Sequence, residues 1–165
     1  MTQRLFPEWH LQDAIQLTWP GAESDWAPIL PRIEATLEAM VVTIARHQRV
    51  LISVADEATR QRLGASFRQL GIERARLLFV LAPSDDSWAR DHGPLAIERD
   101  GRVVLLDYRF TGWGGKFPAA RDDALTSRLQ AAGVFAAPVE TRELILEGGA
   151  IDSDGAGTLL TTEAC

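Results

Sequence analysis

The sequence is poor in cysteine, with Cys165 as the single example among 165 residues. One cysteine cannot form an internal disulfide, and it excludes zinc sites that are built on pairs of cysteines. We therefore expect a reducing, cytoplasmic environment. The three histidines, His10, His47 and His92, lack the spacing of metal ligands, so no metal site is predicted.

Long hydrophobic runs and an excess of basic residues are also missing. No stretch approaches the roughly 18 apolar residues of a membrane span, and the first ten residues, MTQRLFPEWH, contain no apolar segment of the kind a secretory signal needs. We therefore expect no membrane segment. With 17 basic and 23 acidic residues the net charge is −6, and the pI is near 5.1. This balance argues against nucleic acid or an anionic membrane as the main partner and weakly favours a cationic ligand.

The remaining composition is that of an ordinary globular chain. Hydrophobic residues make up 46% and charged residues 24%, and 165 residues suffice for one domain with a core. Strand patterns at residues 13–19, 49–54 and 77–81 alternate with helical patterns at 28–47 and 56–70. This alternation predicts the α/β class. No linker interrupts the sequence, so we expect one domain over residues 1–165 without an internal boundary.

The second half of the sequence has the pattern of hairpins and a glycine-rich loop. A hairpin is predicted from residues 95–98 and 102–108, with Asp100-Gly101 at its turn. A glycine-rich loop, TGWGGKFPAA, follows, and a helix is expected from Asp122 or Asp123 to near Gly133. A strand is expected at residues 134–139, and residues 143–146 lead into a second hairpin.

One short stretch combines residues that belong neither to a solvated loop nor to a core. Residues 85–94, DDSWARDHGP, place three aspartates, an arginine and a histidine around Trp88. A solvated loop does not need the indole, and a core does not favour the charges. The stretch therefore indicates a site, with Asp91 and Trp88 as candidate residues.

A weak internal repeat suggests a partner for Asp91. Asp91 is followed by a glycine within two residues, a short apolar strand and the Asp-Gly turn at 100–101. Glu147 is followed by two glycines, a short strand and the Asp-Gly turn at 154–155. If these stretches are repeated modules around an axis, the two carboxylates occupy equivalent places and point at one ligand. The nearby glycines would let the backbone approach that ligand closely.

Two carboxylates beside aromatic rings describe a pocket for a planar cation. Trp88 lies three residues before Asp91, and Trp113 lies in a second glycine-rich stretch, GWGG. A guanidinium fits such a pocket best, because it is flat and its fork of donors pairs with a carboxylate through two hydrogen bonds.

Structural interpretations of the same residues remain open. Trp88 can be a core or lid aromatic, Asp91 can form an internal ion pair with Arg90, and GWGG can serve only to turn the chain. Glu147 can be a residue at a hairpin entry. His92 fits a hydrogen-bonded structural role better than that of a base.

The sequence resembles the agmatine deiminase family, which groups with the bacterial-type peptidylarginine deiminases. The stretches that carry the resemblance are PEWHLQDAIQLTWP, DDSWARDHGP, FTGWGGKF and LEGGAIDSDGAGTLLTTEAC, in the family's order and over nearly the whole chain. The family's fold is the pentein, a five-module α/β propeller with the active site on its axis. The resemblance implies that this chain supplies about two of the five modules.

The resemblance also implies a reaction. Family members hydrolyse a guanidinium to a ureido group and release ammonia; agmatine gives N-carbamoylputrescine, a step in putrescine biosynthesis. A cysteine attacks the guanidinium carbon, a histidine moves protons and two carboxylates hold the guanidinium nitrogens, without a metal or an organic cofactor. By motif position, Asp91 resembles the catalytic carboxylate that holds substrate and shuttles protons. Glu147 resembles the second pocket carboxylate, and Trp88 resembles a pocket wall.

The sequence departs from the family in its length. The family's Gly-His-x-Asp motif and its glycine-rich cysteine stretch have no counterpart here, and Cys165 corresponds to a cysteine without a catalytic role. We therefore expect the N-terminal half of a deiminase, inactive alone. A peptidylarginine deiminase, or a non-catalytic module that binds cations and self-associates, are alternatives. The expected partner is a small guanidinium compound, and a homo-oligomer is possible for a chain with open strand edges.

Overall fold

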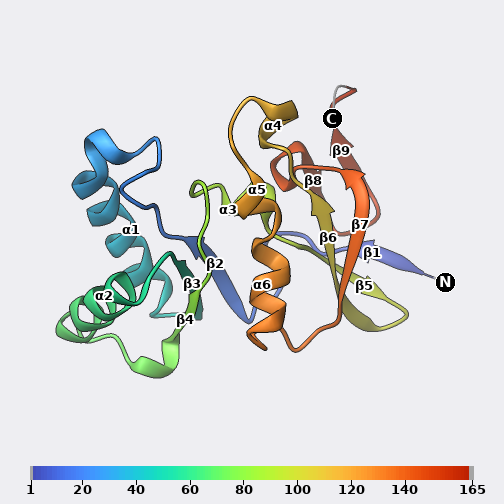
Figure 1. Cartoon of the computed structure of the whole chain (residues 1–165). Helices are drawn as coiled ribbons and strands as arrows, with labels where there is room; N and C mark the ends of the chain where they lie inside the picture. The colour runs from blue at the N-terminus through green and yellow to red at the C-terminus, as the bar shows by residue number, and fades with distance from the viewer. Residues whose placement is uncertain (1, 164–165) are drawn as a thin grey trace. The chain divides into compact units, whose positions relative to one another are not determined.

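The computed structural model describes residues 2–163 and shows a mixed α/β fold (Figure 1). The predicted class is confirmed. The chain divides into two compact units: one formed by Gln12–Ala89, the other by Met1–Leu11 together with Arg90–Cys165. Each unit is described by itself below, and the single-domain expectation stays a prediction.

The continuous unit, residues 12–89, is a three-stranded parallel sheet with strand order β2-β3-β4 and two helical crossovers. Its elements are β2 (Ala14–Thr18), η1 (Ala27–Ile29), α1 (Leu30–Ile44), β3 (Arg49–Val54), α2 (Glu57–Gln69), η2 (Arg74–Arg76) and β4 (Leu77–Leu81). Both helices lie on the same side of the sheet (Figure 1). They bury one apolar cluster against the strands, which includes Val41, Ile52, Leu63 and Phe67.

The predicted elements of this unit are confirmed, and their local causes are visible. The side chain of Asp56 caps α2 by accepting a 2.7 Å hydrogen bond from Thr59 N. Gly71 follows the helix with φ of 78°, a conformation that favours glycine after a helix end. The middle strand, β3, is buried from Val50 to Val54 because it has a neighbour on each edge and helices on one face.

The discontinuous unit is built on a four-stranded sheet with the order β1-β5-β6-β7. The pairs β1–β5 and β5–β6 are antiparallel, and β6–β7 is parallel. Its elements are β1 (Gln3–Leu5), α3 (Ala89–His92, whose first residue belongs to the continuous unit), β5 (Leu95–Arg99), β6 (Arg102–Arg109), α4 (Gly112–Gly115), α5 (Ala120–Asp123), α6 (Leu125–Ala131), β7 (Val139–Ile145), η3 (Gly148–Ala150), β8 (Ile151–Ser153) and β9 (Leu159–Thr161). Strands β8 and β9 form a separate antiparallel hairpin.

Both predicted hairpins are confirmed, but two local predictions need correction and one strand was missed. Residues 134–138 are not a strand; β7 begins at Val139, directly after Pro138, which has no N–H to donate to a sheet. The expected single helix is two short helices, α5 and α6, which meet at Ala124. Strand β1 was not predicted, because its partner β5 lies more than ninety residues away.

Candidate functional site

Asp91 is fixed by the main chain of the stretch that carries Glu147. Its Oδ1 accepts a hydrogen bond of 3.0 Å from the backbone N of Gly149, two residues after Glu147. Asp91 lies on α3 and Gly149 on η3, so these two short helices meet in the fold. The convergence of the Asp91 and Glu147 carboxylates on one ligand stays a prediction.

Two consecutive glycines make this approach possible. A Cβ at Gly148 would lie 2.2 Å from the carbonyl oxygen of Arg90, and a Cβ at Gly149 would lie 2.2 Å from Asp91 Oδ1. Both distances are far shorter than a van der Waals contact. The glycines were expected to admit a ligand; in the structure they admit the main chain and the carboxylate of residues 90–91.

The Glu147 side chain differs from that of Asp91 in having no partner among residues 2–163. Glu147 precedes η3 without a capping hydrogen bond from its side chain, and among residues 2–163 no hydrogen bond or ion pair of its carboxylate is recorded. Its side chain is half-buried. A half-buried carboxylate without a counter-ion is available to a cation, and it lies next to the loop that fixes Asp91.

His92 is buried within the discontinuous unit. It is 4% exposed, its ring centroid lies 6.1 Å from that of Phe110, and its carbonyl accepts a 3.4 Å hydrogen bond from Thr126 Oγ1. This burial supports the structural interpretation of His92 over that of a base.

Trp113 lies in a left-handed helical turn. All four residues of α4 have positive φ, and Trp113, at φ 58° and ψ 56°, is the one that is not glycine. Its ring makes edge-to-face contacts with Phe110 at 5.3 Å and with Phe117 at 5.7 Å. The stretch was expected to be a loop, and the αL turn was missed because a tryptophan there costs energy that only packing offsets.

Trp88 belongs to the continuous unit, whereas the other three candidates belong to the discontinuous one. It is 40% exposed, and its ring centroid lies 6.4 Å from that of Trp26. Trp26 in turn donates a hydrogen bond of 2.8 Å from Nε1 to Ser87 Oγ. Sequence reasoning missed Trp26, although its loop, GAESDW, has the same mixture of acids and an indole as DDSW.

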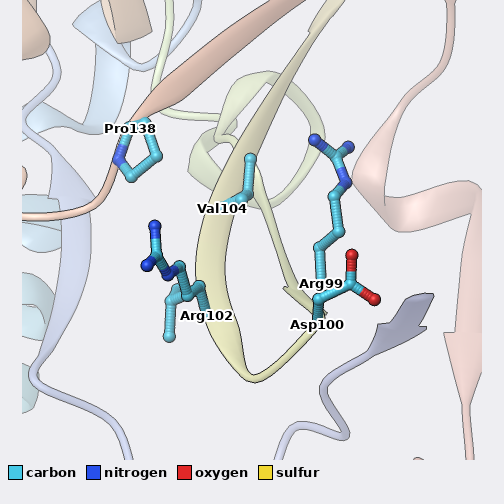
Figure 2. Close-up of a pocket in the computed structure, with 6 residues that line it drawn as sticks. Arg99, Asp100, Arg102, Val104 and Pro138 are labelled. Atoms are coloured by element: carbon cyan, nitrogen blue, oxygen red, sulfur yellow. The ribbon is translucent and has the colours of Figure 1, made fainter. Parts of the chain in front are cut away.

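The structure also has a hollow that is lined partly by charged side chains. A shallow hollow of about 530 Å³ lies beside the β5–β6 turn and is lined by Arg99, Asp100, Arg102, Val103, Val104 and Pro138. Figure 2 shows Arg102 and Pro138 on one side of the hairpin and Arg99 on the other. Arg99 pairs with Glu140 at 2.5 Å, and Asp100 accepts a 3.0 Å hydrogen bond from Thr2 N. None of the predicted site residues lines this hollow.

The described residues contain neither a grouping of metal ligands nor a helix that could span a membrane. Within residues 2–163, no three His, Cys, Asp or Glu side chains are grouped so that they could hold a metal ion. Over the same residues, every helix is too short or too polar to span a bilayer. Cys165 lies outside the described residues.

Comparison with known proteins places this fold in a family. The family model described as Porphyromonas-type peptidyl-arginine deiminase matches residues 4–165. The chain belongs to this family. Agmatine deiminase from Stutzerimonas stutzeri is 31% identical over 164 residues, and agmatine deiminase from Pseudomonas aeruginosa is 33% identical over 173 residues.

Solved structures of the family give the same result. Agmatine deiminase from C. jejuni, with substrate bound, is 31% identical with a TM-score of 0.86, and the match covers 97% of this chain and 45% of that one. The matches to the two curated relatives cover 96% and 98% of this chain but only 43% and 44% of theirs. The chain thus spans less than half the length of the relatives that it matches.

Proposed function

We propose that this chain supplies the guanidinium-holding carboxylates of a guanidine-hydrolysing deiminase, with agmatine as the substrate. The observation that carries the proposal is the hydrogen bond from Gly149 N to Asp91 Oδ1, which places Asp91 beside the loop of Glu147 in a chain of the deiminase family. The name of the relatives that it matches, agmatine deiminase, supports the choice of substrate.

In this proposal Asp91 and Glu147 bind the guanidinium nitrogens through charge-assisted hydrogen bonds. Asp91 Oδ2 is the oxygen left to the ligand, because Oδ1 is occupied by Gly149. The reaction adds water to the guanidinium carbon and releases ammonia, so a carboxylate that holds a departing nitrogen can also carry a proton to it. Trp113, in the same unit as both carboxylates, is proposed to bound the pocket through its ring face.

We also propose a source for the two catalytic groups that residues 1–165 do not supply. The nucleophilic cysteine and the catalytic histidine expected for the family have no counterpart in residues 1–165, and we propose that polypeptide corresponding to the uncovered length of the relatives supplies them. The complete protein is then a five-module propeller, cytoplasmic, without a metal or organic cofactor, and this chain alone binds the guanidinium without hydrolysing it.

Calorimetric titration of agmatine into the 165-residue chain tests the proposal. We expect binding that is lost in Asp91→Asn and in Glu147→Gln and that putrescine, which has no guanidinium, does not reproduce. Glu143→Gln is the matched control, because the Glu143 side chain is 92% exposed and makes only a 3.9 Å ion pair with Arg109. Equal agmatine affinity in the wild type and in Asp91→Asn would contradict the proposal.

The same titration decides between substrates. The family model is named for peptidyl-arginine deiminases, so a peptide that ends in arginine is the second ligand to test. Tighter binding of the peptide than of agmatine would assign the chain to peptide substrates. Sedimentation at rising chain concentration, with no ligand present, examines the alternative of a self-associating module.

A further inference from the structure

Arg90 is adjacent to Asp91 in the sequence, yet its guanidinium is engaged elsewhere. It makes a 2.6 Å ion pair with Glu8, donates a 3.1 Å hydrogen bond to the carbonyl oxygen of Ile151, and lies 3.9 Å from Asp152. These partners come from two segments of the same unit, the stretch before β2 and strand β8. Arg90 therefore ties three segments together.

These contacts matter for Asp91 because a nearby arginine competes with a guanidinium ligand for the Asp91 carboxylate. A guanidinium of the protein would form the same paired hydrogen bonds that a guanidinium ligand forms. Among residues 2–163, the recorded hydrogen bond of the Asp91 side chain is the one from Gly149. Glu8 and Asp152 thus bind the Arg90 guanidinium, which could otherwise neutralise the Asp91 carboxylate.

The main chain of Arg90 is fixed together with its side chain. The Arg90 carbonyl oxygen lies so close to Gly148 that a Cβ there would be 2.2 Å away. The guanidinium reaches Ile151 and Asp152, three and four residues beyond Gly148. Arg90 therefore contacts the η3–β8 segment at two points, and Asp91 follows it directly.

We propose that Arg90 is a positioning residue: it holds Asp91 against the Glu147 loop, while Glu8 and Asp152 keep its own guanidinium away from the Asp91 carboxylate. The inference rests on the proposed function only in taking Asp91 as the ligand-holding group. Exposed ion pairs contribute little to stability, so the role of this cluster lies in geometry and in removing a competing cation.

The backbone amide of Gly149 offers a direct measurement of the positioning. Because this N–H donates to Asp91, its exchange with solvent deuterium should be slowed in the wild-type chain. In Arg90→Gln we expect this exchange to become about tenfold faster, in an NMR spectrum that stays dispersed. Arg60→Gln is the matched control, since Arg60 forms an ion pair with Glu57 on α2 in the other unit.

A second variant separates positioning from the loss of one charge. In the double variant Glu8→Gln with Asp152→Asn, Arg90 is retained but released, so it should pair with Asp91. Agmatine affinity should then fall by roughly tenfold, and the exchange of the Gly149 amide should become faster, as in Arg90→Gln. This variant also covers the case in which Arg90→Gln does not fold.

The role of Arg90 and the proposed function can be contradicted separately. A Gly149 amide that exchanges equally fast in the wild type and in both cluster variants would overturn the role of Arg90, whatever agmatine does. A wild-type chain that does not bind agmatine would overturn the proposed function, while the amide exchange still decides whether Arg90 positions Asp91. An agmatine affinity unchanged in the double variant would overturn the part assigned to Glu8 and Asp152.

Discussion

At the scale of single residues, Gly149 shows how the absence of a side chain determines the place of a neighbouring carboxylate, that of Asp91. Its N–H can reach Asp91 Oδ1 because no Cβ stands between them. The backbone at Gly149 has no positive φ, so the requirement for glycine there is one of space and not of conformation. The position of the carboxylate therefore depends on the glycine.

The first prediction concerns this pair. Gly149→Ala should lower the free energy of unfolding by about 1–3 kcal/mol, because the new methyl group displaces the Asp91 carboxylate, and agmatine binding should be lost with it. Urea unfolding and calorimetry measure the two effects. Gly64→Ala is the matched control: no atom lies within 4 Å of a Cβ there, and in the middle of α2 alanine should stabilise by about 0.5–1 kcal/mol. Equal effects of the two substitutions would contradict the steric argument.

Asp107, on β6, is a buried acid that the proposed reaction does not use. It is 6% exposed, and burial raises its pKa to about 6, against a lowering by a hydrogen bond with Thr126, while nearby Asp123 raises it further. The folded protein then binds this proton more tightly than the unfolded chain, whose carboxyl has its ordinary pKa of 3.8. Its contribution to stability is present below pH 3.8 and is lost as the pH rises through about 6.

Asp107→Asn should therefore stabilise the protein by about 1–3 kcal/mol at neutral pH and have little effect in acid, because it removes the ionised buried carboxylate. Urea unfolding at about pH 4 and about pH 7.5 measures the difference. Asp13→Asn is a control with a side chain that is 98% exposed. A stability difference between Asp107→Asn and wild type that does not change with pH would argue against the raised pKa.

At the scale of elements, the left-handed turn of α4 sets local strain against packing. Thr111 Oγ1 accepts a 3.1 Å hydrogen bond from Gly114 N, and Thr111 O accepts one of 2.9 Å from Gly115 N, which together close the turn. The strain falls on Trp113 alone, because the other three residues are glycines. The ring contacts with Phe110 and Phe117 offset it.

Replacing Trp113 separates these two contributions. Trp113→Ala removes the ring and keeps the strain, whereas Trp113→Gly removes both. We expect the glycine variant to be more stable than the alanine variant by about 1 kcal/mol, the reverse of their order in an ordinary helix. Both should be less stable than wild type in urea. An alanine variant as stable as the glycine variant would mean that the turn has rearranged.

Helix α2 gives a prediction that needs no knowledge of the site. Asp56 accepts hydrogen bonds from both N and Oγ1 of Thr59, and these lower its pKa. Asp56→Ala should shift the urea midpoint downward without changing the denaturant slope, and Asp56→Asn should recover most of the loss. Because the pKa is lowered, the capping contribution is present above the carboxyl's ordinary pKa and is lost as the pH falls through the lowered value. An alanine variant with a wild-type midpoint would show that the cap contributes nothing.

At the scale of the whole molecule, charge and the proposed ligand can be related. The chain carries a net charge of −6, and agmatine is a cation. Agmatine affinity should weaken severalfold between about 0.05 M and 0.5 M NaCl, since added salt screens the attraction. Calorimetry at a series of salt concentrations measures this, with Glu143→Gln as the control of equal net-charge change for Glu147→Gln. An affinity independent of salt would argue against binding through carboxylates.

Much of this molecule could be predicted from its sequence, and the failures have a common cause. Hydrophobic periodicity located β3, and an N-cap aspartate with a terminal glycine located α2, because both signals are local. Strand β1 depends on a distant partner, and the αL turn at Trp113 depends on ring packing, so neither has a local signal. The internal repeat suggested that Asp91 and Glu147 converge, which stays a prediction, whereas the contact of Gly149 with Asp91 and the ion pairs of Arg90 have no local signal in the sequence.

The division of the chain into units has a consequence for its synthesis on the ribosome. Residues 12–89 form a unit that is continuous in sequence, so it can fold as soon as it has emerged. Strand β1 is made before this unit but pairs with β5, which is made after it; Gln3 lies opposite Arg99. At roughly 5–20 residues per second, β1 stays unpaired for several seconds, until residues 12–89 and then β5 have been made. During that interval the nascent chain is a folded insert preceded by a strand that still lacks its sheet.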